Sequence, residues 1–420
     1  MAGSSHFNAL CQITIHTVNG QDVAMGVGTD YPFVTSVQVT RVFERSSDIS
    51  VTIEAPFNEG REMMNSDLFH SGNKITIRMS YPDDSKAQFE VQGVILKGGV
   101  GLSVTPNGIS GSLSVRGTSI TSEQKKPMVQ PGENYDAFVW LKAVVVEAGY
   151  IDLIASERIK NDLSIIDTQF NGANSLEGHL EDFCMMNGFR WVENYDMDRG
   201  GNIIEILDDE EIDIKPVSRI FVMRDSFMDT AYLANNEFIK NAGAEKATAY
   251  PIISYSPELS GGFFANTETM KSSLRGIDGD GKTEVKDETA KSVRSVKQGI
   301  KGGDPSDGTE DQQAGGTTTV KAVDEKTTGE VISPLYPETK DRDVDKKRLV
   351  RVMSRNLISY NASLTTFGVP DLVPSERIAV VGLGALLDGI FTVKEVTQVW
   401  SAGKIDTTIG IYGRTNGVDA

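Results

Sequence analysis

The feature that most constrains the fold is the alternation of apolar and polar residues with a period of two. It is clearest in residues 367–413, where Thr407, Ile409 and Ile411 recur at every second position. Because successive side chains of a strand point to opposite faces, this period is typical of strands with one buried face. Leu-Asp-Gly and Ser-Ala-Gly-Lys turns separate the runs. The block therefore predicts three antiparallel strands.

Residues 10–118 show the same alternation, for example in Ile13 and Ile15 and again in Val37 and Val39. Frequent turn signals, such as Asn-Gly and Pro-Asp-Asp, divide the segment into six or seven short strands, which favours a barrel or a sandwich. Glycines inside one strand region predict bulges or bends that help to close a small barrel. These are Gly93, Gly98, Gly99 and Gly101.

The pattern changes in the middle of the chain. Phe138, Leu141 and Val145 follow helical spacing, and Gly149 ends this predicted helix. A second helix begins after Asn174-Ser175 and ends at Gly188. Two strands, residues 189–192 and 202–207, then form a hairpin around a polar turn. Together these elements predict a compact α+β unit.

Strands resume from about residue 217, with runs at 219–223 and 245–255. Residues 266–335 contain no aromatic residue, and such a segment cannot bury enough apolar surface to order itself. We expect it to be flexible alone and hypothesise that it lies against a neighbouring subunit. Residues 341–355 predict an amphipathic helix, and a further strand at 356–366 leads into the closing block.

Composition limits the function classes. The chain has 420 residues, 39% hydrophobic and 24% charged, which is typical of a globular protein of two or three domains. Its net charge of -18 argues against a tightly held nucleic acid, although an acidic wall would let DNA slide past. Solubility is the simpler explanation of the charge. The first residues show no secretory signal and no run could span a bilayer, so we expect no membrane contact.

One phosphate-loop match is formally complete, from Gly276 to Lys282 and Thr283. The residues before it are polar, whereas a phosphate loop follows a buried strand. Asp278 and Asp280 would also place negative charge in the phosphate cradle. We therefore interpret Gly276, Lys282 and Thr283 as a chance match and predict no bound cofactor. The same stretch lacks the glycine and the final glutamate of a calcium loop.

Other candidate sites are weaker. The acidic run 208–211 could bind a metal, but such a run is typical of a solvated turn at a strand end. Gly382-Leu-Gly384 precedes a strand instead of a helix, which favours a β-turn over a dinucleotide site. The four histidines have no ligand spacing, the two cysteines form no thiolate site, and no nucleophile elbow occurs, so we predict no metal and no catalytic residue. A carboxylate pair brought together by folding stays open. We expect the tryptophans to be core or interface residues. These are Trp140, Trp191 and Trp400.

The closing block resembles the end of the baseplate hub proteins of contractile phage tails, the late control protein D and type VI spike hub group. A basic amphipathic segment (346–355) precedes a strand, and Gly368-Val-Pro-Asp-Leu, Pro374 and Asp388-Gly389-Ile-Phe-Thr-Val follow in order. The middle unit adds a helix, Gly-Phe-Arg-Trp and Ile-Ile-Glu-Ile. Pro-Ser-Glu replaces the commoner Pro-Gly turn, and the polar insertion is long.

This resemblance implies a mainly β chain with an α+β insertion and two similar small antiparallel β-barrels. Three chains would assemble as a pseudo-six-fold ring that adapts a six-fold tail tube to a three-fold spike. The implied division is a first tube-like barrel, a middle domain, a polar extended insertion and a second tube-like barrel. The corresponding ranges are 1–122, 123–215, 266–340, and 216–265 with 341–420.

The implied protein is a structural hub, not an enzyme, located in the virion baseplate and made in the host cytoplasm. Its partners would be two further copies of itself, a tail tube or tube-initiator protein above, a spike below, wedge proteins around it, and DNA as passing cargo. A tail-associated cell-wall hydrolase and a carbohydrate-binding adhesin are the alternatives. The sequence leaves open whether the particle is a phage or a phage-like injection device, and which residues face the lumen.

Overall fold

The computed structural model describes most of the chain. The described residues are 9–25, 33–82, 84–104, 110–119, 136–164, 175–223, 236, 239–240, 243–244, 247–259, 267–277, 283–293, 319–323, 360–384 and 387–413. Within them the protein is mainly β, as expected, with a few short helices. The predicted helix 341–355 and residues 278–282 lie outside the described residues.

The first β unit has seven strands in the order β2-β1-β5-β6-β7-β4-β3, all paired antiparallel. The inward positions of its strands form one apolar core. A short helix α1 (Phe57–Met64) and the 3₁₀ turn η1 (Asp67–Phe69) connect β4 to β5 and were not predicted. The strands are β1 (Leu10–His16), β2 (Asp22–Met25), β3 (Phe33–Val42), β4 (Asp48–Pro56), β5 (Lys74–Tyr81), β6 (Asp84–Val104) and β7 (Ser110–Thr118).

The second β unit has seven strands in the order β12-β11-β18-β19-β20-β17-β13. β12 runs directly into β13 through Ile253, so that this one segment pairs with β11 at its start and with β17 at its end. The strands are β11 (Val217–Met223), β12 (Thr248–Ile252), β13 (Ser254–Leu259), β17 (Tyr360–Phe367), β18 (Arg377–Val381), β19 (Gly389–Ser401) and β20 (Lys404–Gly413).

The two orders are the same when the strands of each unit are numbered along the chain. β1 to β7 correspond in turn to β11, β12, β13, β17, β18, β19 and β20. Only β11 differs, because it runs parallel to β12 and β18 whereas β1 is antiparallel to β2 and β5. The expectation of purely antiparallel pairing is therefore wrong at β11. Its two faces are both covered, by clusters around Phe221 and around Ile220 and Val222, as is usual for parallel strands.

The middle unit has a three-stranded sheet in the order β8-β10-β9 with helices packed on it. The predicted helices and hairpin are confirmed. Ser175 caps α4 by accepting a hydrogen bond from the Gly178 N–H, and Gly188 ends this helix in the left-handed conformation. The elements are α2 (Ala137–Glu147), β8 (Asp152–Ile154), α3 (Glu157–Ser164), α4 (Leu176–Asn187), β9 (Arg190–Asp196), β10 (Gly201–Leu207) and α5 (Asp209–Ile214).

The polar insertion contains a separate antiparallel sheet in the order β14-β15-β16. Its strands are β14 (Thr267–Ile277), β15 (Thr283–Val293) and β16 (Thr319–Val323), and they pair only with one another among the strands described. The insertion leaves the second unit from Leu259 and returns at Tyr360, which are direct partners in the β13–β17 ladder.

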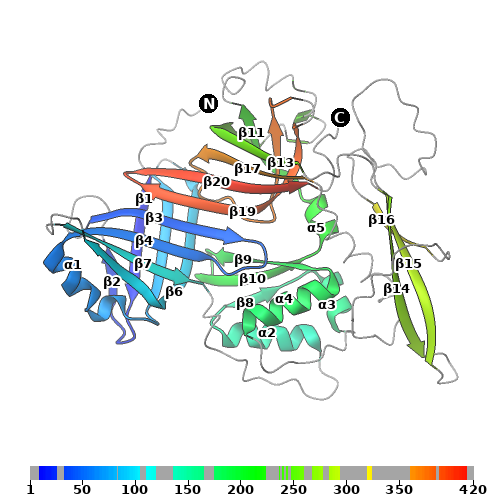
Figure 1. The fold of residues 1–420 in the computed structure, drawn as a ribbon, viewed down its shortest axis with the longest axis horizontal. Helices are drawn as coiled ribbons and strands as arrows, with labels where there is room; N and C mark the ends of the chain where they lie inside the picture. Colours follow the sequence, from blue (N-terminus) through cyan, green and yellow to red (C-terminus); the bar gives the residue numbers. More distant parts are fainter. Residues whose placement is uncertain are drawn as a thin grey trace.

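The two β units are joined into one sheet by the ladder between β3 and β19, from Ser36–Ser401 to Val42–Glu395. In Figure 1, β20, β19, β3, β4 and β7 lie side by side across both units. Trp400 lies within this ladder opposite Val37, and Trp400 and Ile405, next to the hairpin turn, are buried in the core of the first unit. The Trp400 indole donates to the Ala9 carbonyl at 2.9 Å, which fixes the start of β1 against the hairpin.

Candidate functional site

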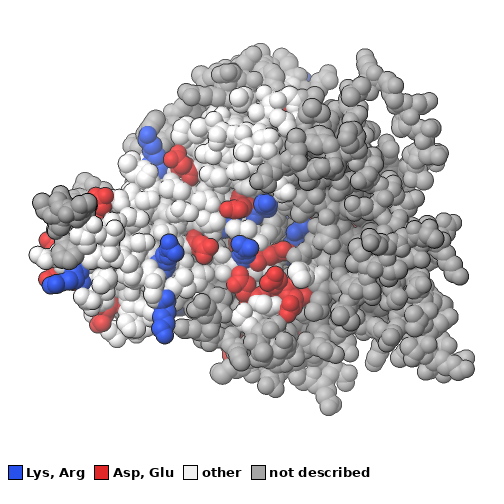
Figure 2. All heavy atoms as spheres, in the orientation of Figure 1, with Lys and Arg blue, Asp and Glu red and all other residues white. Residues whose placement is uncertain are grey.

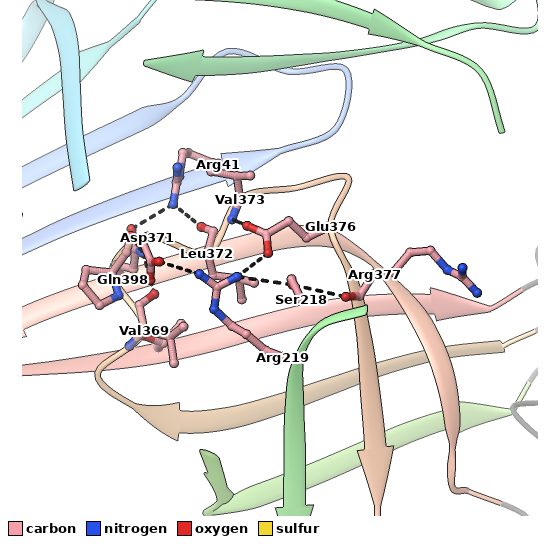
Figure 3. Close-up of polar contacts among 12 residues, drawn as sticks. Arg41, Ser218, Arg219, Val369, Asp371, Leu372, Val373, Glu376, Arg377 and Gln398 are labelled. Atoms are coloured by element: carbon pink, nitrogen blue, oxygen red, sulfur yellow. Dashed lines mark hydrogen bonds and ion pairs between the residues drawn. The ribbon is translucent and has the colours of Figure 1, made fainter. Parts of the chain in front are cut away.

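The candidate site is the junction where the three units meet, and Arg41 connects the first β unit to the second there. Arg41 occupies an inward position of β3, in step with Val37 and Val39, and its side chain is buried. Its guanidinium donates to the Leu372 carbonyl and, at 3.3 Å, to the Gln398 side-chain oxygen (Figure 3). Burial lowers the pKa of Arg41 to about 10, so this cation stays charged at neutral pH.

The partner of Arg41 is the connection between β17 and β18, residues 368–376. Gln398 donates to the carbonyls of Val369, at 3.1 Å, and Pro370, which holds this loop from the β19 side. Arg219 on β11 donates to Asp371 at 2.5 Å and also to Glu376 (Figure 3). Two arginines from different units therefore fix one loop of the second unit on opposite sides.

A buried carboxylate, Glu193 on β9, joins the middle unit to the first β unit. Ser47, in the connection between β3 and β4, donates its hydroxyl at 2.5 Å and its N–H at 3.0 Å to one oxygen. Tyr150 and Asn202 donate to the other oxygen at 3.0 and 3.1 Å. Burial raises the pKa of Glu193, while these donors stabilise its ionised form. Asn202 also donates to the Gln92 carbonyl at 2.7 Å.

All three units meet at a small apolar cluster that includes Phe43 just after β3, Tyr412 of β20 and Val192 of β9. The Phe43 and Tyr412 rings lie edge to face, with centroids 6.2 Å apart. The buried guanidinium of Arg190 lies 5.3 Å from the Tyr412 ring and donates to Asp209 at 2.9 Å. This arrangement fixes the units relative to one another through directed hydrogen bonds, which is a mechanical role.

Sequence reasoning missed these residues, although a signal exists. Arg41 and Gln398 stand at positions where the alternation predicts an inward side chain, and Glu193 follows an apolar run in a predicted strand. A charged or amide side chain at an inward strand position must find a hydrogen-bonding partner, because an unpaired buried polar group is costly. The partner itself cannot be read from the pattern.

The residues of the phosphate-loop match do not join the junction. Gly276 lies near the end of β14 opposite Glu284, and Thr283 begins β15 opposite Ile277, while Lys282 is outside the described residues. The strand before the match is thus followed by an antiparallel strand, whereas a phosphate loop leads into a helix. Asp287, which follows the match in the chain, lies on β15 opposite Ser273.

The acidic run was predicted to be a solvated turn, and this is wrong. Asp208 and Asp209 are buried, Asp208 caps α5 by accepting from the Glu211 N–H at 2.8 Å, and Arg158 pairs with Asp208 and Glu210. Four acidic residues in succession are accommodated because the first helical turn favours negative charge.

Gly382 and Gly384 have positive φ and lie in the connection between the antiparallel strands β18 and β19, in agreement with the predicted turn. The three tryptophans are buried, as predicted. No cluster of three potential metal ligands occurs among the described residues. In that same part of the chain, no helix combines the length and hydropathy needed to cross a bilayer.

No protein-family model and no curated protein sequence matches the chain. Solved structures do match. A 43 kDa tail protein of prophage MuSo2 from Shewanella oneidensis is 12% identical, with a TM-score of 0.51 over 97% of this chain and 99% of that one. A tail protein from Neisseria meningitidis MC58 is 10% identical, with a TM-score of 0.54 over the same shares of the two chains. Both matches span the two β units, the middle unit and the junction between them. The chain therefore has the fold of phage tail proteins.

Proposed function

We propose that the chain is the structural hub of a phage or phage-like tail baseplate, with no enzymatic role. Three copies form a ring of six β-barrels that adapts a six-fold tail tube above to a three-fold spike below. Wedge proteins surround the ring and DNA passes through it as cargo. The division into 1–122, 123–215, 266–340, and 216–265 with 341–420 is part of this proposal.

The observation that carries the proposal is the repeated strand order of the two β units, joined side by side by the β3–β19 ladder. A chain with two equivalent units in series gives six equivalent units from three copies. Such a chain can therefore meet a six-fold partner on one side and a three-fold partner on the other.

The pairing within the second unit supports a barrel. Its ladders run from β11 through β18, β19, β20 and β17 to β13, and β13 is continuous with β12, which pairs back to β11. This continuity brings the two ends of the sheet together, as in a small barrel.

The outward face of the joined sheet supports a channel wall. Thr365, Thr408, Thr397 and Thr40 are successive partners across β17, β20, β19 and β3, and the last two hydroxyls are 3.1 Å apart. In Figure 2, acidic and basic groups are scattered over these strands, whereas they lie close together toward the middle unit. This row of hydroxyls carries no positive charge that would hold a phosphate, which suits a wall along which DNA moves.

Light scattering tests the proposal most directly. We expect a particle of three times the 45.6 kDa chain mass and, in electron micrographs, end-on views of a ring with six similar lobes. A stable monomer or dimer at micromolar concentration contradicts the hub. A monomer that cleaves peptidoglycan would replace it with the hydrolase alternative.

A further inference from the structure

Each β unit has one strand that changes partner along its length. In the second unit, β19 pairs with β18 through residues 389–392 and, after an irregularity at Val393–Glu395, with β3 through residues 395–401. In the first unit, β6 pairs with β5 as far as Val94, and a similar irregularity follows it. Beyond that point, among the strands described, β6 pairs with β7 alone. β6 therefore has an open edge at the position where its counterpart β19 pairs with β3.

The counterpart of β3 has a matching edge. β3 pairs with β4 on one side and with β19 on the other. β13 corresponds to β3, and it pairs with β17, the counterpart of β4. Among the described strands, β13 has no second partner strand. One chain therefore contains one complete ladder of this kind, β3–β19, and two open edges, on β6 and β13, that correspond to its two sides.

Apolar pairs that face the cores fix how the two units correspond residue by residue. Val100 pairs with Val115 in the first unit, and Val396 pairs with Ile409 in the second, so Ser103 corresponds to Val399. On the other side of the sheet, Val115 pairs with Val51 and Ile409 with Leu364. This match makes Ser256 the counterpart of Gln38.

We propose that β13 of one copy pairs antiparallel with residues 100–104 of β6 in the next copy, with Ser256 opposite Ser103. The junction between copies then repeats the β3–β19 ladder, in which Gln38 lies opposite Val399. This inference rests on the proposed trimer and specifies its contact. The contact is head-to-tail, closes after three copies and pairs the open edges of β6 and β13.

The residues at this edge suit a close approach of two backbones. Ser103 and Ser256 are exposed, and a Cβ added at Gly101 would meet no atom within 4 Å. Pro257 has no N–H, so the ladder lacks one donor there. Edge strands tolerate a proline at such a position.

Disulfide cross-linking of the full chain tests the register. Ser103→Cys with Ser256→Cys should give covalent dimers and trimers with oxidised glutathione, because paired strands bring Cα atoms to about 5 Å. Cys11 and Cys184 are buried and stay in place. The matched control is Ser103→Cys with Ser363→Cys, because Ser363 lies opposite Ser256 on β17, one strand further away at about 10 Å. Ser256→Cys with Ser363→Cys should form an intrachain disulfide.

The outcomes separate this inference from the proposed function. Cross-linked trimers for Ser103–Ser256 alone support the pairing. A trimer by light scattering in which this pair cross-links no more than the Ser103–Ser363 control overturns the pairing and leaves the hub intact. A wild-type chain that stays monomeric removes the hub itself, and the pairing with it.

A charge exchange provides a test without covalent bonds. Ser103→Glu with Ser256→Glu places like charges directly opposite at every junction and should weaken assembly about tenfold or more. Ser103→Glu with Ser256→Lys should assemble as well as the wild type. Equal assembly of the two double variants, with circular dichroism unchanged, overturns the proposed register.

Discussion

At the scale of single residues, the junction depends on polar side chains in inward positions. Arg41 and Gln398 lie where neighbouring positions are apolar, and together they hold three backbone carbonyls of the connection after β17. The strand pattern locates such residues, but a local pattern does not identify a distant partner. Leu372, for example, is more than three hundred positions away from Arg41.

Arg41→Ala should lower the free energy of unfolding by about 3 kcal/mol, because a buried carbonyl and a buried amide lose their donor and a cavity forms. Urea denaturation measures this change. Arg45→Ala, which truncates an exposed arginine just beyond β3, should stay within about 0.5 kcal/mol of the wild type. Similar small effects of both variants would contradict the role given to Arg41.

Glu193→Gln tests the buried carboxylate. Burial raises the pKa of Glu193 in the folded protein, so its contribution to stability is fully present below the unfolded pKa of about 4.3 and is lost as pH rises through the folded value. The stability difference between wild type and Glu193→Gln should therefore be largest near about pH 4 and shrink toward neutrality. Urea titrations at several pH values measure it, with Glu54→Gln as an exposed control for the lost charge. A difference that grows with pH would contradict this sign.

At the scale of elements, the β19–β20 hairpin belongs to both units. The alternation in residues 367–413 predicts its strands correctly, and the bulge predicted by the glycines of β6 is confirmed by the irregular register between Ile95 and Val100. Periodicity cannot show that the hairpin tip enters the core of the first unit, because the same pattern fits any apolar surface. The helices α1, α3 and α5 were missed because their few residues give no clear helical period.

Trp400→Ala tests whether the β19–β20 hairpin stabilises the first unit as well as the second. We expect a loss of about 3–5 kcal/mol, with faster amide exchange in β1, whose start receives the indole hydrogen bond. The control is Phe391→Ala on the same strand, which opens the core of the second unit instead. Hydrogen exchange followed by mass spectrometry resolves the two responses. Unchanged exchange in β1 of Trp400→Ala would contradict the shared core.

At the scale of the whole molecule, the sequence predicts the three kinds of unit but not their connection. The equivalence of the two β units appears only from the strand order, since β11 is reversed relative to β1 and the insertion separates β13 from β17. Of the candidate sites, only Asp209 of the acidic run reaches the junction, through Arg190, whereas Gly276, Thr283, Gly382 and Gly384 do not. The other junction residues come from segments far apart in the chain.

Replacing residues 260–359 with an Asn-Gly turn should leave the fold intact, because Leu259 and Tyr360 are ladder partners that a two-residue turn can join. The shorter loop should add up to about 3 kcal/mol to the free energy of unfolding. Assembly should weaken if the insertion lies against a neighbouring copy, as we hypothesise. Light scattering and urea denaturation measure both effects: an unfolded variant contradicts the separate folding of the insertion, and an unchanged trimer contradicts its contact with a neighbour.

The shared hairpin also has a consequence for synthesis on the ribosome. Strands β1 to β7 are translated before the middle unit and the insertion, but Trp400 and Ile405, which complete the core of the first unit, are translated after both. Part of the apolar interior of the nascent first unit therefore stays uncovered until β19 and β20 have been made. A chain whose translation stops before β19 can complete neither unit, so it also lacks the joined sheet through which we propose that the copies assemble.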